Sequence, residues 1–195
     1  AARKEASKLN VPRIGVRFRL PASMNQVEYF GRGPAENYLD RNAGSMVGLY
    51  KSTAEELYFP YVRPQENGHH TDTRWVSLST GKKGLLIQAD NTIGFNALRN
   101  SIEDFDDEEA TGLSRQWSNF TPEQVANHDE AAAKNVLRRQ HHINDITPRD
   151  FVEVCVDLKQ QGVAGYDSWG SRPEPAYTLP ANREYNWGFT LIPLK

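Results

Sequence analysis

The fold class follows from residues 74–89, which read RWVSLSTGKKGLLIQA. Two apolar runs, Trp75–Leu78 and Leu85–Ala89, flank a turn at Thr80–Gly84 that contains two glycines. Glycine takes the positive φ angles of a tight chain reversal at little steric cost. The pattern predicts a β-hairpin and, from Arg74 onward, an antiparallel β domain.

Alternating apolar and polar residues predict more strands on both sides of this hairpin. They are expected at Pro12–Leu20, Gln26–Phe30, Phe95–Arg99, Phe151–Leu158 and Tyr185–Ile192. Many short strands separated by turns are typical of a β-sandwich or a barrel. The predicted fold class is therefore all-β.

Three segments depart from the strand pattern. One peripheral helix is predicted from about Pro122 to Arg139, because Thr121 can cap it and proline suits the first helical position. Residues 46–58 have a weak helical period and are compatible with a loop as well. The acidic run within residues 101–109 is expected to be a solvated loop.

Length and composition limit the functional classes. The chain has 195 residues, which suits one large domain, and its 23 basic and 25 acidic residues give a formal net charge of −2. This balance favours neither nucleic acid nor an anionic membrane as a partner. Apolar runs are only a few residues long, so no membrane span is expected. The lone Cys155 excludes an internal disulfide, which suits a cytoplasmic protein and is compatible with a periplasmic one.

The N-terminal segment 1–10 is expected to be a linker, and residues 11–195 a single β domain. Ala1–Lys8 has no initiator methionine and no apolar core, so it does not resemble a signal peptide. The chain is therefore expected to be a piece of a longer protein.

Isolated polar groups are present, but no complete catalytic set is evident. Glu36, Asp40 and Glu66 are candidate carboxylates for glycoside hydrolysis, but their positions do not establish a pair. The pairs His69-His70 and His141-His142 lack the cysteine or carboxylate spacing that completes a metal site. We expect no catalytic residue and no metal ligand, and we interpret these histidines as polar surface or loop residues.

Residues 165–170 read GYDSWG and lie between two of the clearest strand patterns. The flanking glycines, together with Asp167 and Ser168, favour a tight turn with Trp169 at the tip of a loop. The indole ring either folds back to cap the core, as most aromatic side chains do, or stays outside as a flat platform. Sugars have apolar C–H faces that suit such a platform.

Three segments of the chain match the sequence pattern of a known protein family. They read GRGPAENYLDR at 31–41, PYVRPQENG at 60–68 with a continuation to Thr73-Arg74, and DSW at 167–169. In this order they resemble the C-terminal domain of large bacterial β-galactosidases of glycoside hydrolase family 2, which cleave lactose. Together with the strand that starts at Pro12, the resemblance covers about residues 11–192.

The resemblance implies a large antiparallel β-sandwich, the supersandwich of galactose mutarotases. It also implies that both catalytic carboxylates lie on a separate TIM-barrel domain, while this domain closes one side of the pocket. Trp169 matches the loop tryptophan that forms a platform for the leaving or acceptor sugar. The other matched residues are expected to be structural: Glu36, Asn37, Arg41, Glu66, Asn67, Gly68, Arg74, Asp167 and Ser168.

The same resemblance implies the partners. They are a β-galactoside substrate and the remaining domains of a parent enzyme, which is expected to be a homo-oligomer. No cofactor is expected in this domain, and any magnesium or sodium ions of the parent are expected at its catalytic domain. Residues 103–140 depart from the family pattern and have no functional assignment.

A second hypothesis is a free-standing carbohydrate-binding or aldose mutarotase-like module. A mutarotase requires a histidine and a glutamate that act as acid and base on a sugar, and His69, His70 and Glu66 are the candidates. The linker-like N-terminus and the missing initiator methionine favour a domain of a larger enzyme instead.

Overall fold

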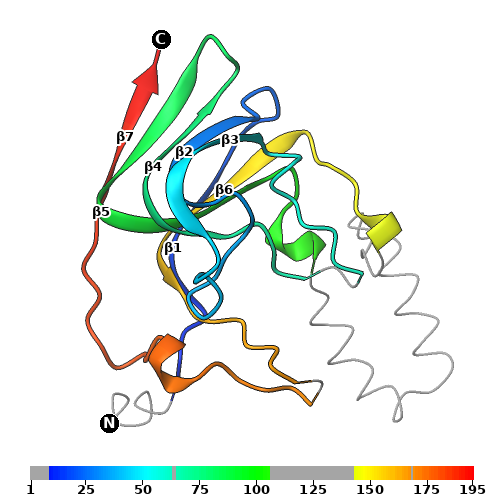
Figure 1. Ribbon diagram of the computed structural model, residues 1–195. Helices are drawn as coiled ribbons and strands as arrows, with labels where there is room; N and C mark the ends of the chain where they lie inside the picture. The colour runs from blue at the N-terminus through cyan, green and yellow to red at the C-terminus, as the bar shows by residue number, and fades with distance from the viewer. Residues whose placement is uncertain (1–8, 63–64, 106–142, 168) are drawn as a thin grey trace, which may run out of the picture. The chain divides into compact units, whose positions relative to one another are not determined.

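The computed structural model describes residues 9–62, 65–105, 143–167 and 169–195. Its seven strands form one antiparallel sheet (Figure 1): β1 Arg13–Pro21, β2 Gln26–Gly33, β3 Met46–Thr53, β4 His70–Ser79, β5 Gly84–Leu98, β6 Phe151–Gln160 and β7 Phe189–Leu194. The helices in these residues are three-residue 3-10 turns at Ile102–Asp104, Ile143–Asp145 and Pro175–Tyr177. The all-β, antiparallel prediction is confirmed. The helix predicted near Pro122–Arg139 lies outside the described residues, as do His141 and His142.

The chain divides into two compact units. The first consists of residues 1–59, 67–99 and 149–195 and holds all seven strands, whereas the second consists of residues 60–66 and 100–148. In the second unit the carboxylate of Asp104 accepts a hydrogen bond from the backbone N–H of Ser101 at 3.0 Å. Asp104 is only 4% exposed whereas Glu103 is exposed, so the described start of the acidic run is a 3-10 turn with one buried carboxylate. The rest of the run lies outside the described residues.

The strand order is β1-β6-β5-β4-β2-β3, and β7 pairs with β5. The first half of β5, Gly84–Ala89, pairs with β7, and its second half, Gly94–Leu98, pairs with β6. The sequence predicted two separate strands here, because exposed polar residues at Asp90 and Asn91 interrupt the apolar pattern. The structure joins them into one 15-residue strand that changes partner at this polar stretch.

Strand β3 corrects the expectation of helix or loop at residues 46–58. It pairs along its full length with β2, from Gln26 opposite Thr53 to Gly33 opposite Met46, and ends the strand order. Met46, Val47 and Leu49 are 70%, 40% and 58% exposed. These outward apolar side chains break the alternation of a half-buried strand, which is why the sequence pattern was misleading.

Strand β6 is buried on both of its faces. Val152, Val154 and Val156 are fully buried on one face. On the opposite face Glu153 and Asp157 are also buried, and arginines of the neighbouring β1 neutralise them: Arg19 lies 3.1 Å from Glu153, and Arg13 lies 3.0 Å from Asp157. Buried carboxylates require such partners, because desolvation of an isolated charge is costly.

Both ends of the described chain take part in pairing. The backbone carbonyl of Leu9 accepts a hydrogen bond from Ala181 at 2.8 Å, and Asn10 forms a bridge with Pro180. At the other end, β7 begins at Phe189 and not at Tyr185, which shortens the final strand relative to the sequence pattern.

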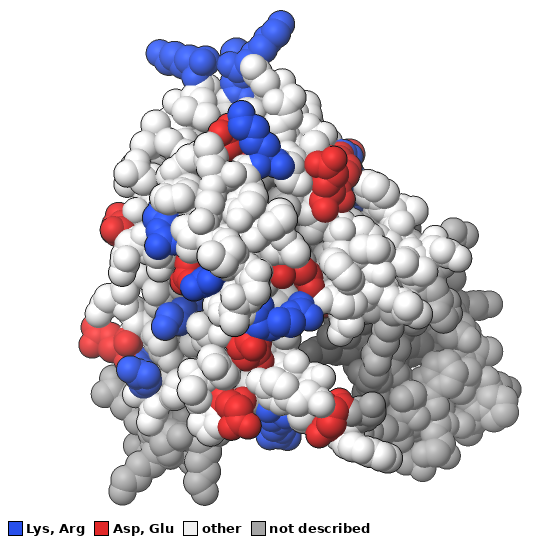
Figure 2. Space-filling view, viewed as in Figure 1, with Lys and Arg blue, Asp and Glu red and all other residues white. Residues whose placement is uncertain are grey.

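The surface carries charges of both signs. Figure 2 shows lysine and arginine side chains interspersed with aspartate and glutamate on the face in view. In the parts of the chain that are described, no helix has the length and apolarity needed to cross a membrane.

Candidate functional site

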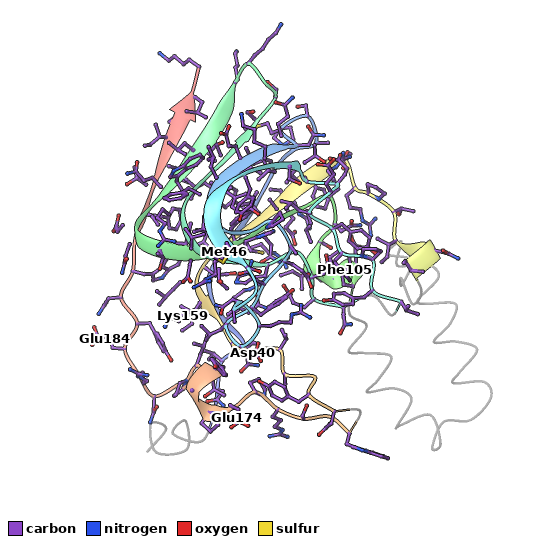
Figure 3. The ribbon with its side chains drawn as sticks, viewed as in Figure 1. Asp40, Met46, Phe105, Lys159, Glu174 and Glu184 are labelled. Carbon is purple, nitrogen blue, oxygen red and sulfur yellow. The ribbon has the colours of Figure 1, made fainter. Side chains whose placement is uncertain are left out.

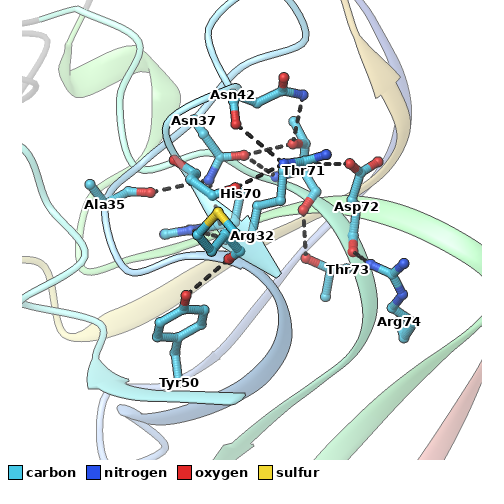
Figure 4. Close-up of polar contacts among 12 residues, drawn as sticks. Arg32, Ala35, Asn37, Asn42, Tyr50, His70, Thr71, Asp72, Thr73 and Arg74 are labelled. Atoms are coloured by element: carbon cyan, nitrogen blue, oxygen red, sulfur yellow. Dashed lines mark hydrogen bonds and ion pairs between the residues drawn. The ribbon is translucent and has the colours of Figure 1, made fainter. Parts of the chain in front are cut away.

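The first matched segment turns around the buried side chain of Asn37 (Figure 4). Its amide nitrogen donates to the carbonyls of Arg32 and Ala35, both at 3.1 Å. Its amide oxygen accepts from the N–H of Thr71 at 2.9 Å and from the hydroxyl of Thr71 at 2.6 Å. Two donors and two acceptors use the full capacity of this amide, so Asn37 fixes the turn against strand β4.

Glu36 connects the first matched segment to the second. Its side chain is 5% exposed, and its Oε2 accepts a hydrogen bond from the backbone N–H of Gly68 at 2.6 Å. Its Oε1 accepts from the guanidinium of Arg41 at 2.7 Å, and that guanidinium lies over the ring of Tyr38. Both carboxylate oxygens of Glu36 are therefore occupied by loop contacts.

The second segment holds its own loop closed. The side-chain oxygen of Asn67 accepts from the N–H of Phe59 at 3.2 Å, and its backbone carbonyl accepts from Asn96 at 2.8 Å. Gly68 has φ of 72°, and a Cβ there would lie 2.9 Å from the backbone carbonyl oxygen of Leu57, so glycine is required on two grounds. The guanidinium of Arg74 lies over the ring of Phe30, 5.6 Å from its centroid.

Glu66 is half-buried and belongs to the second unit together with the start of its segment, whereas Asn67, Gly68 and Arg74 belong to the first unit.

His69 and His70 are core residues, which corrects their interpretation as polar surface groups. They are 2% and 1% exposed; His69 stacks on Tyr38 and His70 on Phe95. Burial, and next the charge of Arg13, lowers the pKa of His69 to about 3. Burial lowers the pKa of His70 to about 4. Both rings are therefore neutral and enclosed at neutral pH, which disfavours them as acid and base of a mutarotase.

The loop after β6 presents Trp169 to solvent. Gly165 and Gly170 have φ of 85° and 83°, and the carboxylate of Asp167 accepts hydrogen bonds from the N–H groups of Trp169 at 2.8 Å and Ser171 at 3.3 Å. Trp169 is 93% exposed, so the indole does not cap the core. Ser168 lies outside the described residues.

Asp40 is the residue at this site whose role the sequence did not indicate. Its carboxylate accepts hydrogen bonds from the N–H groups of Val163 at 3.1 Å and Ala164 at 2.8 Å, and from the hydroxyl of Tyr166 at 3.3 Å. The first matched segment therefore contacts the loop of the third. The presence of an aspartate in the matched segment was the one feature of the sequence that could have indicated this contact.

A second surface feature lies apart from the matched segments. A shallow hollow of about 380 Å³ is lined by Glu28, Trp75, Ser77, Leu86, Gln88 and Leu194. Within the described ranges, no group of three or more histidine, cysteine, aspartate or glutamate side chains is arranged to hold a metal ion.

Comparisons with known proteins support the resemblance that the three matched segments indicated. A family model described as beta galactosidase small chain matches residues 1–191. A β-galactosidase of Priestia megaterium is 35% identical over 185 residues, which cover 94% of this chain and 15% of the relative. One of Vibrio cholerae is 29% identical over 93% of this chain and 14% of the relative. One of Arthrobacter is 42% identical over 48% of this chain and 10% of the relative. The chain thus spans about 15% or less of the length of these relatives.

Proposed function

Because the chain belongs to the β-galactosidase small chain family, we propose that it closes one side of the substrate pocket in a larger β-galactosidase. The parent enzyme hydrolyses terminal β-D-galactosides such as lactose, and its catalytic carboxylates lie on another domain. Trp169 supplies the platform on which the leaving sugar or an acceptor sugar stacks.

The exposure of Trp169 carries this proposal. An indole that is 93% exposed contributes almost nothing to the core of this chain, yet its loop is held by defined hydrogen bonds. Aromatic rings dominate the energetics of binding surfaces, where a fully buried ring covers roughly 150–250 Å². An exposed ring on a hydrogen-bonded loop is therefore suited to a ligand that has a flat apolar face, as a pyranose does.

The contacts of two candidate carboxylates, Glu36 and Asp40, support a division of labour between domains. Hydrolysis requires a general acid and a second carboxylate that both face the glycosidic bond. In this chain Glu36 accepts from Gly68 and Arg41, while Asp40 accepts from the loop that carries Trp169. Each of these carboxylates holds backbone in place, so we assign the acid and the nucleophile to another part of the parent.

The test is Trp169→Leu in the intact enzyme that contains this chain. Loss of a stacking contact worth about 0.5–1.5 kcal/mol should raise KM for a disaccharide roughly 2- to 13-fold. The rate of the chemical step on a nitrophenyl galactoside should change little, since uniform binding affects KM and not kcat. Trp169→Phe should retain part of the contact.

Trp187→Leu is the matched control, because Trp187 is half-buried against Phe189 and is not proposed to meet sugar. It should lower thermal stability and leave KM for the disaccharide unchanged. Wild-type KM for disaccharide and wild-type transfer to acceptor sugars in Trp169→Leu would reject the platform. If the chain alone bound sugar tightly through Trp169, the free-standing carbohydrate-binding module would be favoured instead.

A further inference from the structure

We infer that Asp40 is the positioning residue of the Trp169 loop and thereby helps to select the sugar that stacks on the indole. This inference rests on the proposed function of Trp169 and identifies the side chain that sets its place. Asp40 acts through the loop and does not itself contact the sugar.

Asp40 and the loop make three hydrogen bonds across more than 120 positions of sequence. The N–H groups of Val163 and Ala164 and the hydroxyl of Tyr166 all donate to its carboxylate. Successive backbone N–H groups form a concave site for an anion, and here that anion is a side chain of the same chain. Figure 3 labels Asp40 beside this part of the chain.

The turn that carries Asp40 is itself fixed to the core. Tyr38 and Arg41 exchange backbone hydrogen bonds at 3.1 and 2.8 Å, which places Leu39 and Asp40 at the tip of a tight turn. Tyr38 is 1% exposed and stacks on His69. Because the buried Tyr38 holds the base of the turn, the Asp40 carboxylate has a defined position.

The backbone of the Trp169 loop takes an unfavourable conformation next to Asp40. Ala164 has φ of 54° and Gly165 has φ of 85°, so two successive residues take the left-handed conformation. This conformation is unfavourable for alanine, and the hydrogen bond from Ala164 to Asp40 at 2.8 Å helps to hold it. Close packing adds to the constraint, since a Cβ on Gly162 would lie 2.4 Å from the Asp40 carboxylate.

The constraint reaches Trp169 through a short path. Tyr166, whose hydroxyl bonds Asp40, is followed by Asp167, whose carboxylate caps the N–H of Trp169 at 2.8 Å. Stacking depends on the position and tilt of the ring, because dispersion contacts weaken sharply when a gap opens. Without Asp40 the indole would remain exposed but would sample positions that do not match the sugar.

The first test is Asp40→Asn in the intact parent enzyme. Asparagine keeps the shape but replaces one acceptor oxygen by a donor NH₂, which faces the loop N–H groups unfavourably. We expect KM for a disaccharide to rise roughly 2- to 10-fold, which is no more than the rise expected for Trp169→Leu. The kcat on a nitrophenyl galactoside should be nearly unchanged. Asp90→Asn is the matched control: Asp90 is an exposed aspartate of β5 next to Gly188, and its variant should match the wild type.

A double-mutant cycle then separates positioning from general stability. If Asp40 acts through Trp169, Asp40→Asn should have little further effect on disaccharide KM in a Trp169→Leu background. Full additivity of the two effects would overturn the inference. So would an unchanged KM in Asp40→Asn when Trp169→Leu alone raises it. No effect of Trp169→Leu itself would reject the proposed function instead.

Tyr166→Phe covers the case in which Asp40→Asn fails to fold. It removes one hydroxyl from a ring that is 56% exposed and leaves the core untouched. We expect a smaller rise in disaccharide KM with the same sign and an unchanged melting temperature. Wild-type KM in this variant would count against Asp40 as the anchor.

Discussion

The imidazole ring of His70 stacks on the phenyl ring of Phe95, with 5.1 Å between the ring centroids and 20° between their planes. The ring of Tyr29 also packs on the imidazole of His70, with 4.8 Å between the ring centroids. The polar groups near its Nδ1 are the carbonyl of Arg32 at 3.1 Å and the hydroxyl of Tyr29 at 3.3 Å. Such an enclosure cannot solvate a charge, and His70 is therefore neutral in the folded chain.

This stacking predicts that the chain loses stability in mild acid. The pKa of His70 is about 4 when folded and 6.5 when exposed. Between these values the unfolded chain binds more protons than the folded chain. The contribution of the neutral His70 to the free energy of unfolding is therefore fully present above pH 6.5 and is lost as the pH falls toward 4. The slope for one histidine is at most about 1.4 kcal/mol per pH unit. Urea unfolding at several pH values measures it.

Comparison with His70→Phe isolates the contribution of this histidine. Phenylalanine keeps an aromatic ring in the stack but does not titrate, so the slope between pH 6.5 and about 4 should decrease in the variant. Phe95→Leu is the control, because it should lower stability at every pH and keep the wild-type slope. An unchanged slope in His70→Phe would contradict a buried, neutral His70.

Glu36→Ala should destabilise the fold. The Glu36 carboxylate accepts from the N–H of Gly68, which lies 32 positions later, and thus connects two of the matched segments. Removal of the acceptor leaves a buried N–H without this partner, which costs about 1–3 kcal/mol. The melting temperature of the 195-residue chain should fall accordingly.

Glu28→Ala is the control for Glu36→Ala. Glu28 is 37% exposed and lies 3.6 Å from Lys51, and such a surface pair contributes less than about 1 kcal/mol. An equal fall in melting temperature in the two variants would contradict a stabilising hydrogen bond between Glu36 and Gly68.

The sequence pattern predicted strands best where one face is buried and the turn chemistry is simple. The hairpin of β4 and β5 meets both conditions, whereas the valine alternation of β6 was recognised although both faces of that strand are buried. It failed at β3, whose outward residues Met46 and Leu49 are apolar, and at the polar middle of β5. At these positions, pairing with neighbouring strands outweighs the local pattern.

The candidate site was predictable only in part, because its contacts join distant positions. The flanking glycines of residues 165–170 placed Trp169 in a loop, but they did not decide whether the ring is buried. Asp40 meets Val163 across 123 positions, and no local pattern encodes that contact. The histidines were misinterpreted for the opposite reason, since polarity predicts exposure while ring stacking buries His69 and His70.

Arg13→Met should be among the most damaging changes on β1. The Arg13 guanidinium lies 3.0 Å from the carboxylate of Asp157, which is 1% exposed. Removal of one partner of a buried ion pair costs about 3–5 kcal/mol, because the other charge remains buried. Arg17→Met is the matched control, since Arg17 is 41% exposed and 3.7 Å from Glu153. Urea unfolding should show a much larger loss for Arg13→Met.

The isolated chain should not hydrolyse β-galactosides. Cleavage needs two carboxyl groups about 5–10 Å apart that both face the sugar. Glu36 is held by Gly68 and Arg41, and Asp40 is held by the Trp169 loop, so neither is placed as an acid or a nucleophile. Highly purified chain should therefore release no nitrophenol from a nitrophenyl galactoside above the buffer rate, while the intact enzyme serves as the positive control. Traces of host enzyme are the main source of false activity, and Glu36→Gln, Asp40→Asn and Glu66→Gln distinguish the two cases. Contaminating turnover would persist in all three variants, whereas turnover that disappears with any of these carboxylates would place catalysis on this chain and reject the division of labour between domains.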